Sequence, residues 1–270
     1  QGPARRRSCP MSTAAPALEV LLQQTYQAEQ RHFWFRGFRR FVRPLLAQAA
    51  AGRTGLRLLD CGCGTGANLR LLAPYGTAYG FDLMRVGLDF AARHYGQPRL
   101  AQASITHLPY RSAQFDIVTS FDVLVCLDRA QEAEAMAEFA RVLKPGGSVV
   151  LNVAALEVLR GTHSVNAREV RRYRRRDMRA ALAAAGFVVY RLTYTNATLF
   201  PFVLALRAFQ RAMGLPTPEE ESSNQLEIPA APVNALFTAA LAFESVLLRH
   251  VDMPVGSSLL VLAHKEAGSR

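Results

Sequence analysis

The residues best suited to bind a ligand lie in one short stretch, DCGCGTG at residues 60–66. The apolar run from Leu56 to Asp60 predicts a buried strand that ends in an acid, and a helix is expected to begin at Asn68. Glycines at three alternate positions let the backbone approach a ligand closely, and the first turn of the helix offers free N–H groups. The stretch therefore predicts a ligand-binding loop between a strand and a helix.

Two classes of ligand fit such a loop. Gly62, Gly64 and Ala67 match the glycine fingerprint of dinucleotide-binding folds, and Asp82 lies about twenty residues on, where an acid can hold ribose hydroxyls. The carboxylate of Asp60 separates the classes, because it repels a pyrophosphate and attracts a ligand that carries ammonium and sulfonium groups. The loop thus favours a cationic amino-acid nucleoside over a dinucleotide. A tight turn without a ligand is the remaining alternative.

Four motifs, in order, resemble those of class I S-adenosylmethionine (SAM)-dependent methyltransferases of the type 11-like family. The glycine loop is similar to their first motif, and GFD at residues 80–82 to their second. LPY at 108–110 with FDIV at 115–118 resembles the stretch before the fourth strand, and RVLKPGG at 141–147 the turn before the fifth. The resemblance covers residues 56–155. It implies methyl transfer by in-line displacement, with SAM as the cofactor and S-adenosyl-L-homocysteine (SAH) as the product.

The resemblance also assigns residues to the cofactor. Asp60 and Gly62 are expected to contact the methionine part, and Gly64 to pack near the adenosine. Asp82 is expected to bind both ribose hydroxyls, and Leu83 to flank the adenine. The other implied cofactor-binding residues are Cys63, Gly66, Ser104, Ile105 and Phe121.

The sequence departs from the family pattern at two places. Ser104, which with Ile105 occupies the position at the adenine edge, stands where relatives often have Asp. Val125 and Cys126 stand where many relatives carry Glu-His, so no base is expected there. No cluster of Cys, His or Asp has metal-ligand spacing, and no metal is expected.

Residues 29–35, EQRHFWF, resemble an E-x-R-H-F-W-F signature in a subset of bacterial methyltransferases linked to surface-glycan or secondary-metabolite pathways. His163 with RRY at 171–173 resembles a second segment of these relatives, with Ser164 in place of their Asp. A histidine is a suitable base for a hydroxyl acceptor. The resemblance implies catalytic residues His32, His163 and Tyr173, and substrate-binding residues Trp34 and Arg172. Core packing of the aromatic residues and a solvated arginine run are the alternatives.

Strands and helices alternate along the chain, which predicts an α/β fold. We expect a Rossmann-like, seven-stranded, mostly parallel sheet with helices on both faces and a reversed last strand. One helix is expected from Leu18 to Leu46, and KPGG at 144–147 predicts a turn. Residues 1–10 are expected to be a tag remnant or disordered extension, and residues 11–55 an N-terminal helical extension. The SAM-binding domain is expected in two parts, at residues 56–195 and 257–266. Residues 196–256 are expected to form a helical cap insertion between the last two strands.

The formal net charge of +11 indicates acidic partners, whereas a solvated basic surface is the alternative. No apolar run reaches the roughly 18 residues that a membrane span needs. The nearest, Thr198 to Phe209, is long enough to touch a membrane surface but not to cross the membrane. Four cysteines without disulfide or zinc spacing predict a reducing, cytoplasmic compartment.

The function that these patterns favour is methylation of a small-molecule or lipid- or glycan-linked acceptor, including an anionic one. The lid-sized insertion with its apolar helices favours an enclosed, partly hydrophobic site. One alternative is an RNA methyltransferase, which the charge permits although no RNA-binding module is visible. Another is a SAM-binding protein that has lost catalysis, in line with the residues at 104, 125 and 126. The motifs identify neither the acceptor atom nor the oligomeric state.

Overall fold

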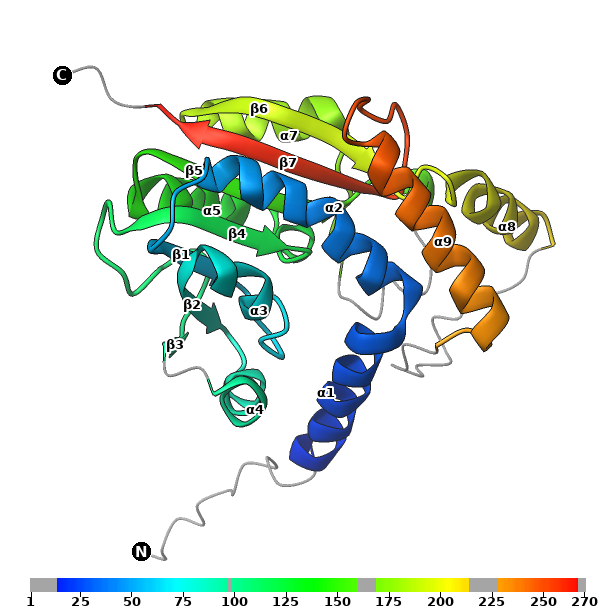
Figure 1. Cartoon of the computed structure of the whole chain (residues 1–270), viewed down its shortest axis with the longest axis horizontal. Helices are drawn as coiled ribbons and strands as arrows, with labels where there is room; N and C mark the ends of the chain where they lie inside the picture. The colour runs from blue at the N-terminus through cyan, green and yellow to red at the C-terminus, as the bar shows by residue number, and fades with distance from the viewer. Residues whose placement is uncertain (1–13, 97–98, 160–168, 214–227, 267–270) are drawn as a thin grey trace, which may run out of the picture.

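A seven-stranded sheet organises the chain in the computed structural model, which describes residues 14–96, 99–159, 169–213 and 228–266 (Figure 1). The strand order is β3-β2-β1-β4-β5-β7-β6. β7 pairs antiparallel with both of its neighbours, and the other pairs are parallel. The predicted mostly parallel sheet with a reversed last strand is confirmed. The strands are β1 (Leu56–Cys61), β2 (Gly76–Asp82), β3 (Leu100–Gln102), β4 (Phe115–Phe121), β5 (Leu143–Ala154), β6 (Phe187–Thr195) and β7 (Ser258–Lys265).

Helices cover both faces of this sheet (Figure 1). They are α1 (Ala14–Arg31), α2 (Phe33–Ala50), α3 (Leu69–Leu72), α4 (Arg85–Tyr95), α5 (Arg129–Val142), α7 (Arg175–Ala184), α8 (Phe200–Ala212) and α9 (Ala231–Leu247), with short 3₁₀ turns η1 (Ala73–Tyr75), η2 (Leu124–Cys126) and η3 (Glu157–Leu159). Phe139 of α5 and Met178 of α7 pack in the core on one face. Phe41 of α2 and Leu241 of α9 pack in the core on the other. Because both faces are covered, every residue of β4 is buried.

The single helix predicted from Leu18 to Leu46 is wrong at one residue. His32 has extended backbone angles, φ −70° and ψ 136°, and separates α1 from α2. Its Nδ1 accepts the backbone N–H of Trp34 at 3.1 Å and so caps α2. Helical periodicity continues on both sides of this break, which is why the pattern hides it. The break lets α1 turn away from the sheet while α2 lies along it (Figure 1).

The turn predicted for residues 144–147 lies within β5, where these residues form a bulge in which Gly146 has a φ of +72°. Phe115 pairs with Leu143, and the next pair in register is Ile117 with Ser148. Four residues of β5 therefore lie opposite Asp116 alone. The lysine of this bulge holds it against β4, since its Nζ lies 2.8 Å from the Asp116 carboxylate.

The inserted helix α9 packs against α2, although the two helices are far apart in the sequence. The amide of Asn234 accepts the N–H of Phe33 at 2.8 Å and donates to the carbonyl of Arg31 at 2.9 Å. Farther along, Leu241 lies over Gly37, where a Cβ would come within 2.4 Å of the leucine side chain. The insertion is therefore joined to the N-terminal helices and to the same face of the sheet.

This packing predicts a stability difference between two leucines of α9. Leu241 is fully buried, so we expect Leu241→Ala to lower the free energy of unfolding by about 2–5 kcal/mol through the cavity that it leaves. Leu236 is exposed, so Leu236→Ala serves as the matched control and should stay within about 0.5 kcal/mol of the parent. Urea unfolding of the two variants and the parent measures this difference. Equal unfolding free energies would mean that α9 does not dock on α2.

Candidate functional site

The glycine loop joins the carboxyl ends of β1 and β2. The N–H groups of Gly62 and Cys63 both donate to the carbonyl of Phe81 at 2.9 Å. Gly62 and Gly64 have φ angles of +78° and +49°, a region that favours glycine. A Cβ on Gly64 would meet nothing within 4 Å. The loop therefore leaves open space directly beside its backbone, where a ligand can lie against the chain.

Asp60 is the acid at the end of β1, and it is only 1% exposed. Its Oδ1 accepts the hydroxyl of Thr119 at 2.7 Å, whereas its Oδ2 is buried without a hydrogen-bond partner from the protein. Burial, with a smaller contribution from the nearby charge of Asp82, raises the pKa of Asp60 to about 7, although the hydrogen bond from Thr119 lowers it. Buried polar atoms normally find partners, so this oxygen indicates a site for a donor from a cationic ligand.

Asp82, at the end of β2, is held by two backbone groups. Its Oδ2 accepts the N–H of Gly64 and its Oδ1 the N–H of Met84, both at 2.9 Å. Each carboxylate oxygen has a further lone pair, so the carboxylate can still accept two hydroxyl donors. Leu83 is 68% exposed beside it, which leaves an apolar surface for a flat base. These features fit the ribose and adenine assignments made from the sequence.

Other residues assigned to the cofactor lie in packing contacts. The Cys63 side chain is buried, and a Cβ on Gly80 would come within 2.9 Å of its sulfur. A Cβ on Gly66 would come within 2.8 Å of Ala91 in α4, so this glycine permits close helix packing. Phe121 is buried against the ring of Phe38, with ring centroids 5.0 Å apart.

The two residues assigned to the adenine edge also contact other parts of the protein. Ile105 is buried in the core, and the Ser104 hydroxyl lies 2.8 Å from that of Thr106.

The described residues assigned to catalysis and to the substrate do not gather at one point. His32 caps α2, and Trp34 stacks on Phe38 with ring centroids 5.6 Å apart. The Tyr173 hydroxyl is buried, where it accepts from Arg171 at 2.7 Å and donates to the carbonyl of Leu124 at 3.3 Å. Burial raises the pKa of Tyr173 well above its usual range. These contacts indicate structural functions for the three side chains.

Arg172, assigned to the substrate, instead contacts the protein. Its Nε donates to Glu169 at 2.9 Å, and its Nη1 donates to the carbonyl of Ala155 at 3.2 Å. Both side chains of this ion pair are largely buried. His163 lies outside the described residues.

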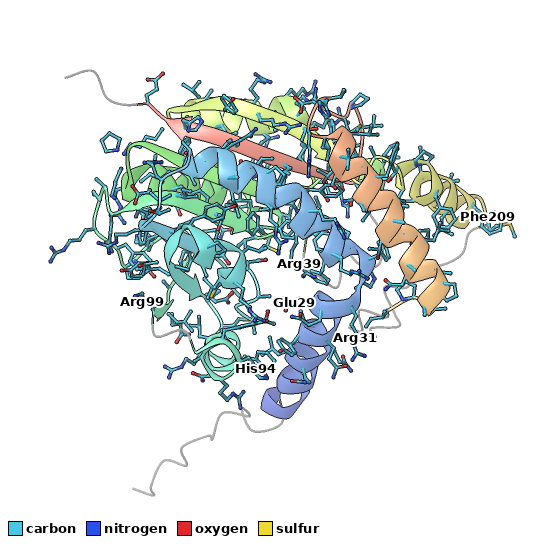
Figure 2. The ribbon with its side chains drawn as sticks, viewed as in Figure 1. Glu29, Arg31, Arg39, His94, Arg99 and Phe209 are labelled. Carbon is cyan, nitrogen blue, oxygen red and sulfur yellow. The ribbon has the colours of Figure 1, made fainter. Side chains whose placement is uncertain are left out.

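Sequence reasoning missed the contact between α1 and the glycine loop. The hydroxyl of Thr65 donates to both carboxylate oxygens of Glu29 at 2.7 Å. Burial raises the pKa of Glu29 to about 7, although the Thr65 hydrogen bond and the charge of Arg39 lower it. Figure 2 shows Glu29 on α1 and Arg39 on α2 near each other, where Arg39 also donates to the Glu29 carbonyl at 2.6 Å. The glutamate that begins the EQRHFWF segment was the available signal.

Asp122 was also missed, although it directly follows β4. Its φ is +59°, a region unusual for a residue with a side chain. The amide of Asn152 donates to its two carboxylate oxygens at 2.9 and 3.0 Å. Burial raises the pKa of Asp122 to about 7, and among the neighbouring charges Glu169 raises it further while Arg172 lowers it. The strained acid at a strand end is therefore a candidate proton acceptor.

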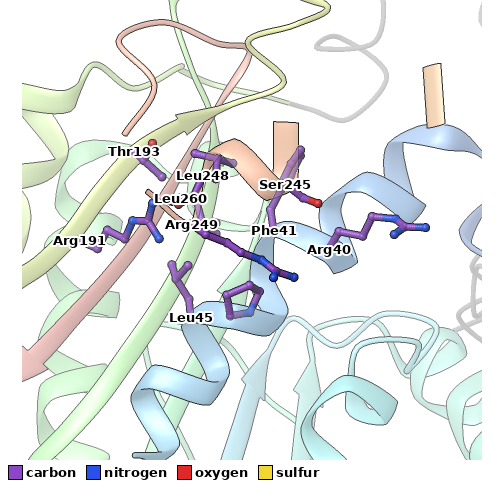
Figure 3. Close-up of a pocket in the computed structure, with 10 residues that line it drawn as sticks. Arg40, Phe41, Leu45, Arg191, Thr193, Ser245, Leu248, Arg249 and Leu260 are labelled. Atoms are coloured by element: carbon purple, nitrogen blue, oxygen red, sulfur yellow. Dashed lines mark hydrogen bonds between the residues drawn. The ribbon is translucent and has the colours of Figure 1, made fainter. Parts of the chain in front are cut away.

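Figure 3 shows a small cavity that lies away from these strand ends, between α2, α9 and the last two strands. Its volume is about 10 Å³, close to the space of one water molecule and too small for a substrate. In the described ranges, no group of three or more His, Cys, Asp or Glu side chains is arranged to hold a metal ion. Of the helices in those ranges, none is both long and apolar enough to span a membrane.

Comparison with known proteins connects this geometry to one family. Residues 59–151 match the family model described as a methyltransferase domain. A malonyl-[acyl-carrier protein] O-methyltransferase of Enterobacter lignolyticus is 34% identical over 122 residues, which cover 45% of this chain and 47% of that protein. The chain spans about half the length of the curated relatives that it matches.

Solved structures share the fold at low sequence identity. The [4+2]-cyclase SpnF is 21% identical with a TM-score of 0.54, over 85% of this chain and 82% of the cyclase chain. A Haemonchus contortus phosphoethanolamine N-methyltransferase 2 in complex with SAM is 17% identical with a TM-score of 0.54, over 83% of this chain and 51% of that one. At these identities the likeness extends to the fold alone.

The raised pKa of Asp60 predicts pH-dependent binding of SAH. Only the ionised carboxylate attracts an ammonium group, so the affinity should fall about tenfold as the pH drops from about 8 to about 6. Asp60→Asn should bind weakly at every pH, like the protonated parent. Titration calorimetry measures both proteins, with NAD as the control ligand. A parent affinity that stays constant over this range in folded protein would refute the assignment.

Proposed function

We propose that this chain, whose residues 59–151 form a class I SAM-dependent methyltransferase domain, methylates a small-molecule or lipid-linked acceptor. The class predicted from the four sequence motifs is confirmed by the family match and by the methyltransferase relatives. Two observations carry the proposal: the buried Oδ2 of Asp60 has no partner from the protein, and the glycine loop that follows Asp60 has open space at Gly64.

The chain's own residues supply binding and orientation. Asp60 binds the cationic amino-acid end of the cofactor, and Asp82 binds its ribose hydroxyls. When bound, SAM supplies a methyl group that is electrophilic because it is attached to a sulfonium. Glu29 holds the loop through Thr65, so the loop is positioned before the ligand arrives. Such positioning of the two reactants is a major source of rate enhancement in bimolecular transfer.

Asp122 is the residue best placed to take a proton from the acceptor. It lies at the carboxyl end of β4, the side of an α/β sheet where substrates approach. Asn152 fixes the orientation of its carboxylate, and its pKa of about 7 suits a base that works near neutral pH. A hydroxyl acceptor would lose its proton to this carboxylate. The name of one relative, an O-methyltransferase, agrees with an oxygen acceptor.

Transfer of a labelled methyl group from SAM tests the proposal directly. Lipid, small-molecule and RNA fractions are offered to the parent, to Asp82→Ala and to Asp89→Ala as the control, since Asp89 is an exposed acid on α4. We expect label in the small-molecule or lipid fraction, and loss of about tenfold to a hundredfold or more of the activity in Asp82→Ala alone. Label in RNA would establish the alternative acceptor class. If none of the fractions became labelled, the result would contradict methyltransferase activity.

Replacement of the proposed base gives a separate prediction. Asp122→Asn keeps the shape of the side chain but removes the proton acceptor, so kcat should fall about a hundredfold or more. At saturating SAM, where the pH-dependent affinity set by Asp60 does not contribute, the parent kcat should rise with pH through about 7 as Asp122 ionises, and the variant kcat should not. SAH binding should be unchanged, which calorimetry checks. An unchanged kcat and pH profile would show that the acceptor needs no base here.

A further inference from the structure

The helices α8 and α9 carry large apolar side chains on their solvent side. In the described part of this region, the exposed apolar residues include Phe202 and Phe209 of α8, Met213 directly after α8, and Leu236, Phe243 and Val246 of α9. We call this set the apolar outer face. Leu236 and Phe243 are 66% and 62% exposed. Several large apolar side chains exposed at one end of a molecule often mark a binding surface.

The sequence of α9 makes its outer side unusual. Among its 17 residues the single charged one is Glu244, which is 0% exposed. That carboxylate points inward, where it accepts the N–H groups of Ala197 and Thr198 just before α8. A surface helix normally presents charged residues to water, and a helix that is apolar all round is normally buried. The outer side of α9 is therefore exposed to solvent, although a helix of this composition is normally buried.

The two helices are linked at two places. Phe202 of α8 packs near Phe237 of α9, with ring centroids 6.0 Å apart. Glu244 adds a second link, because it fixes the start of α8 against α9. Figure 1 shows both helices at the same end of the molecule, and Figure 2 shows Phe209 at the outer edge of α8. Residues 214–227 lie outside the described ranges, so the surface is defined by the helices alone.

Positive charge adjoins the apolar outer face. Arg40 is exposed on α2, which covers the same face of the sheet as α9. Arg40 and Arg249, the latter just after α9, also line the small cavity between the two helices (Figure 3). The sequences of α2, α8 and α9 together contain six arginines and one acid, the buried Glu244. Apolar side chains bordered by arginines are the pattern of helices that lie in a membrane interface.

We propose that the apolar outer face docks this protein on an anionic phospholipid bilayer. The arginines would contact the lipid headgroups while the phenylalanines enter the acyl boundary. A second copy of the chain fits less well, because a symmetric contact would bring the same arginines together without acids to neutralise them. Docking here brings the acceptor side close to the membrane, since α8 also contacts η3, which follows β5. The inference deepens the proposed function and rests on it only for the lipid-linked class of acceptor.

Vesicle co-sedimentation tests the docking. Vesicles of phosphatidylcholine mixed with phosphatidylglycerol are compared with vesicles of phosphatidylcholine alone. We expect the parent to bind the anionic vesicles more tightly and to lose that preference at high salt. Phe243→Glu should lower the partition into anionic vesicles about tenfold or more. Val188→Glu is the matched control, since Val188 is exposed on β6, and it should bind like the parent. Arg40→Gln should weaken binding about fivefold.

Two controls separate the possible failures. SAH binding by every variant shows that the fold is intact, so a loss of vesicle binding is then specific to the surface. Sedimentation velocity reports self-association, and a dimer that Phe243→Glu dissociates, without vesicle binding by the parent, would overturn the proposal in favour of a second copy. Equal vesicle binding by the parent and Phe243→Glu would also overturn it. Vesicle binding without methyl transfer to any fraction would contradict the proposed function alone.

Discussion

The Asp60 carboxylate is buried at the end of β1 with one oxygen bonded to Thr119 and the other without a partner, and this half-satisfied charge governs the site. Burial raises its pKa to about 7, above the value of an unfolded chain. The folded state therefore binds the proton more tightly, and the ligand-free fold loses stability as the pH rises from about 4 to about 7. A cation at the free oxygen would offset that cost. The glycine loop and Asp82 lie next to each other at this site, since Asp82 accepts the N–H of Gly64.

The N-terminal helices belong to this site as much as the sheet does. Thr65 in the glycine loop donates its hydroxyl to Glu29 of α1, so the loop is held from outside the sheet. Tyr26, also on α1, packs edge-on against Phe90 of α4, with ring centroids 5.6 Å apart. The break at His32 is what lets α1 reach these positions while α2 stays on the sheet. The break at the capping residue His32 thus accompanies the contact between α1 and the glycine loop.

The sequence predicted those features that depend on local backbone chemistry. The glycines after β1, and the position of Asp82 at the end of β2, could be predicted because the turn favours glycine and the strand pattern is local. Contacts between distant segments could not, because nothing in the spacing links Glu29 to Thr65 or Asp122 to Asn152. The prediction of a catalytic function for Tyr173 illustrates the opposite case. Its side chain is reactive by type, yet tertiary packing buries it.

The inner and outer sides of α9 have different functions, which its composition reflects. Its inner side needs Leu241 against Gly37, and its single acid, Glu244, is used to hold the start of α8. No charge remains for the outer side, which a helix exposed only to water would normally carry. Arg40 of the adjacent α2 and Arg249 just after α9 supply positive charge beside it instead. A surface that is apolar at its centre and positive at its border matches an anionic bilayer in both respects.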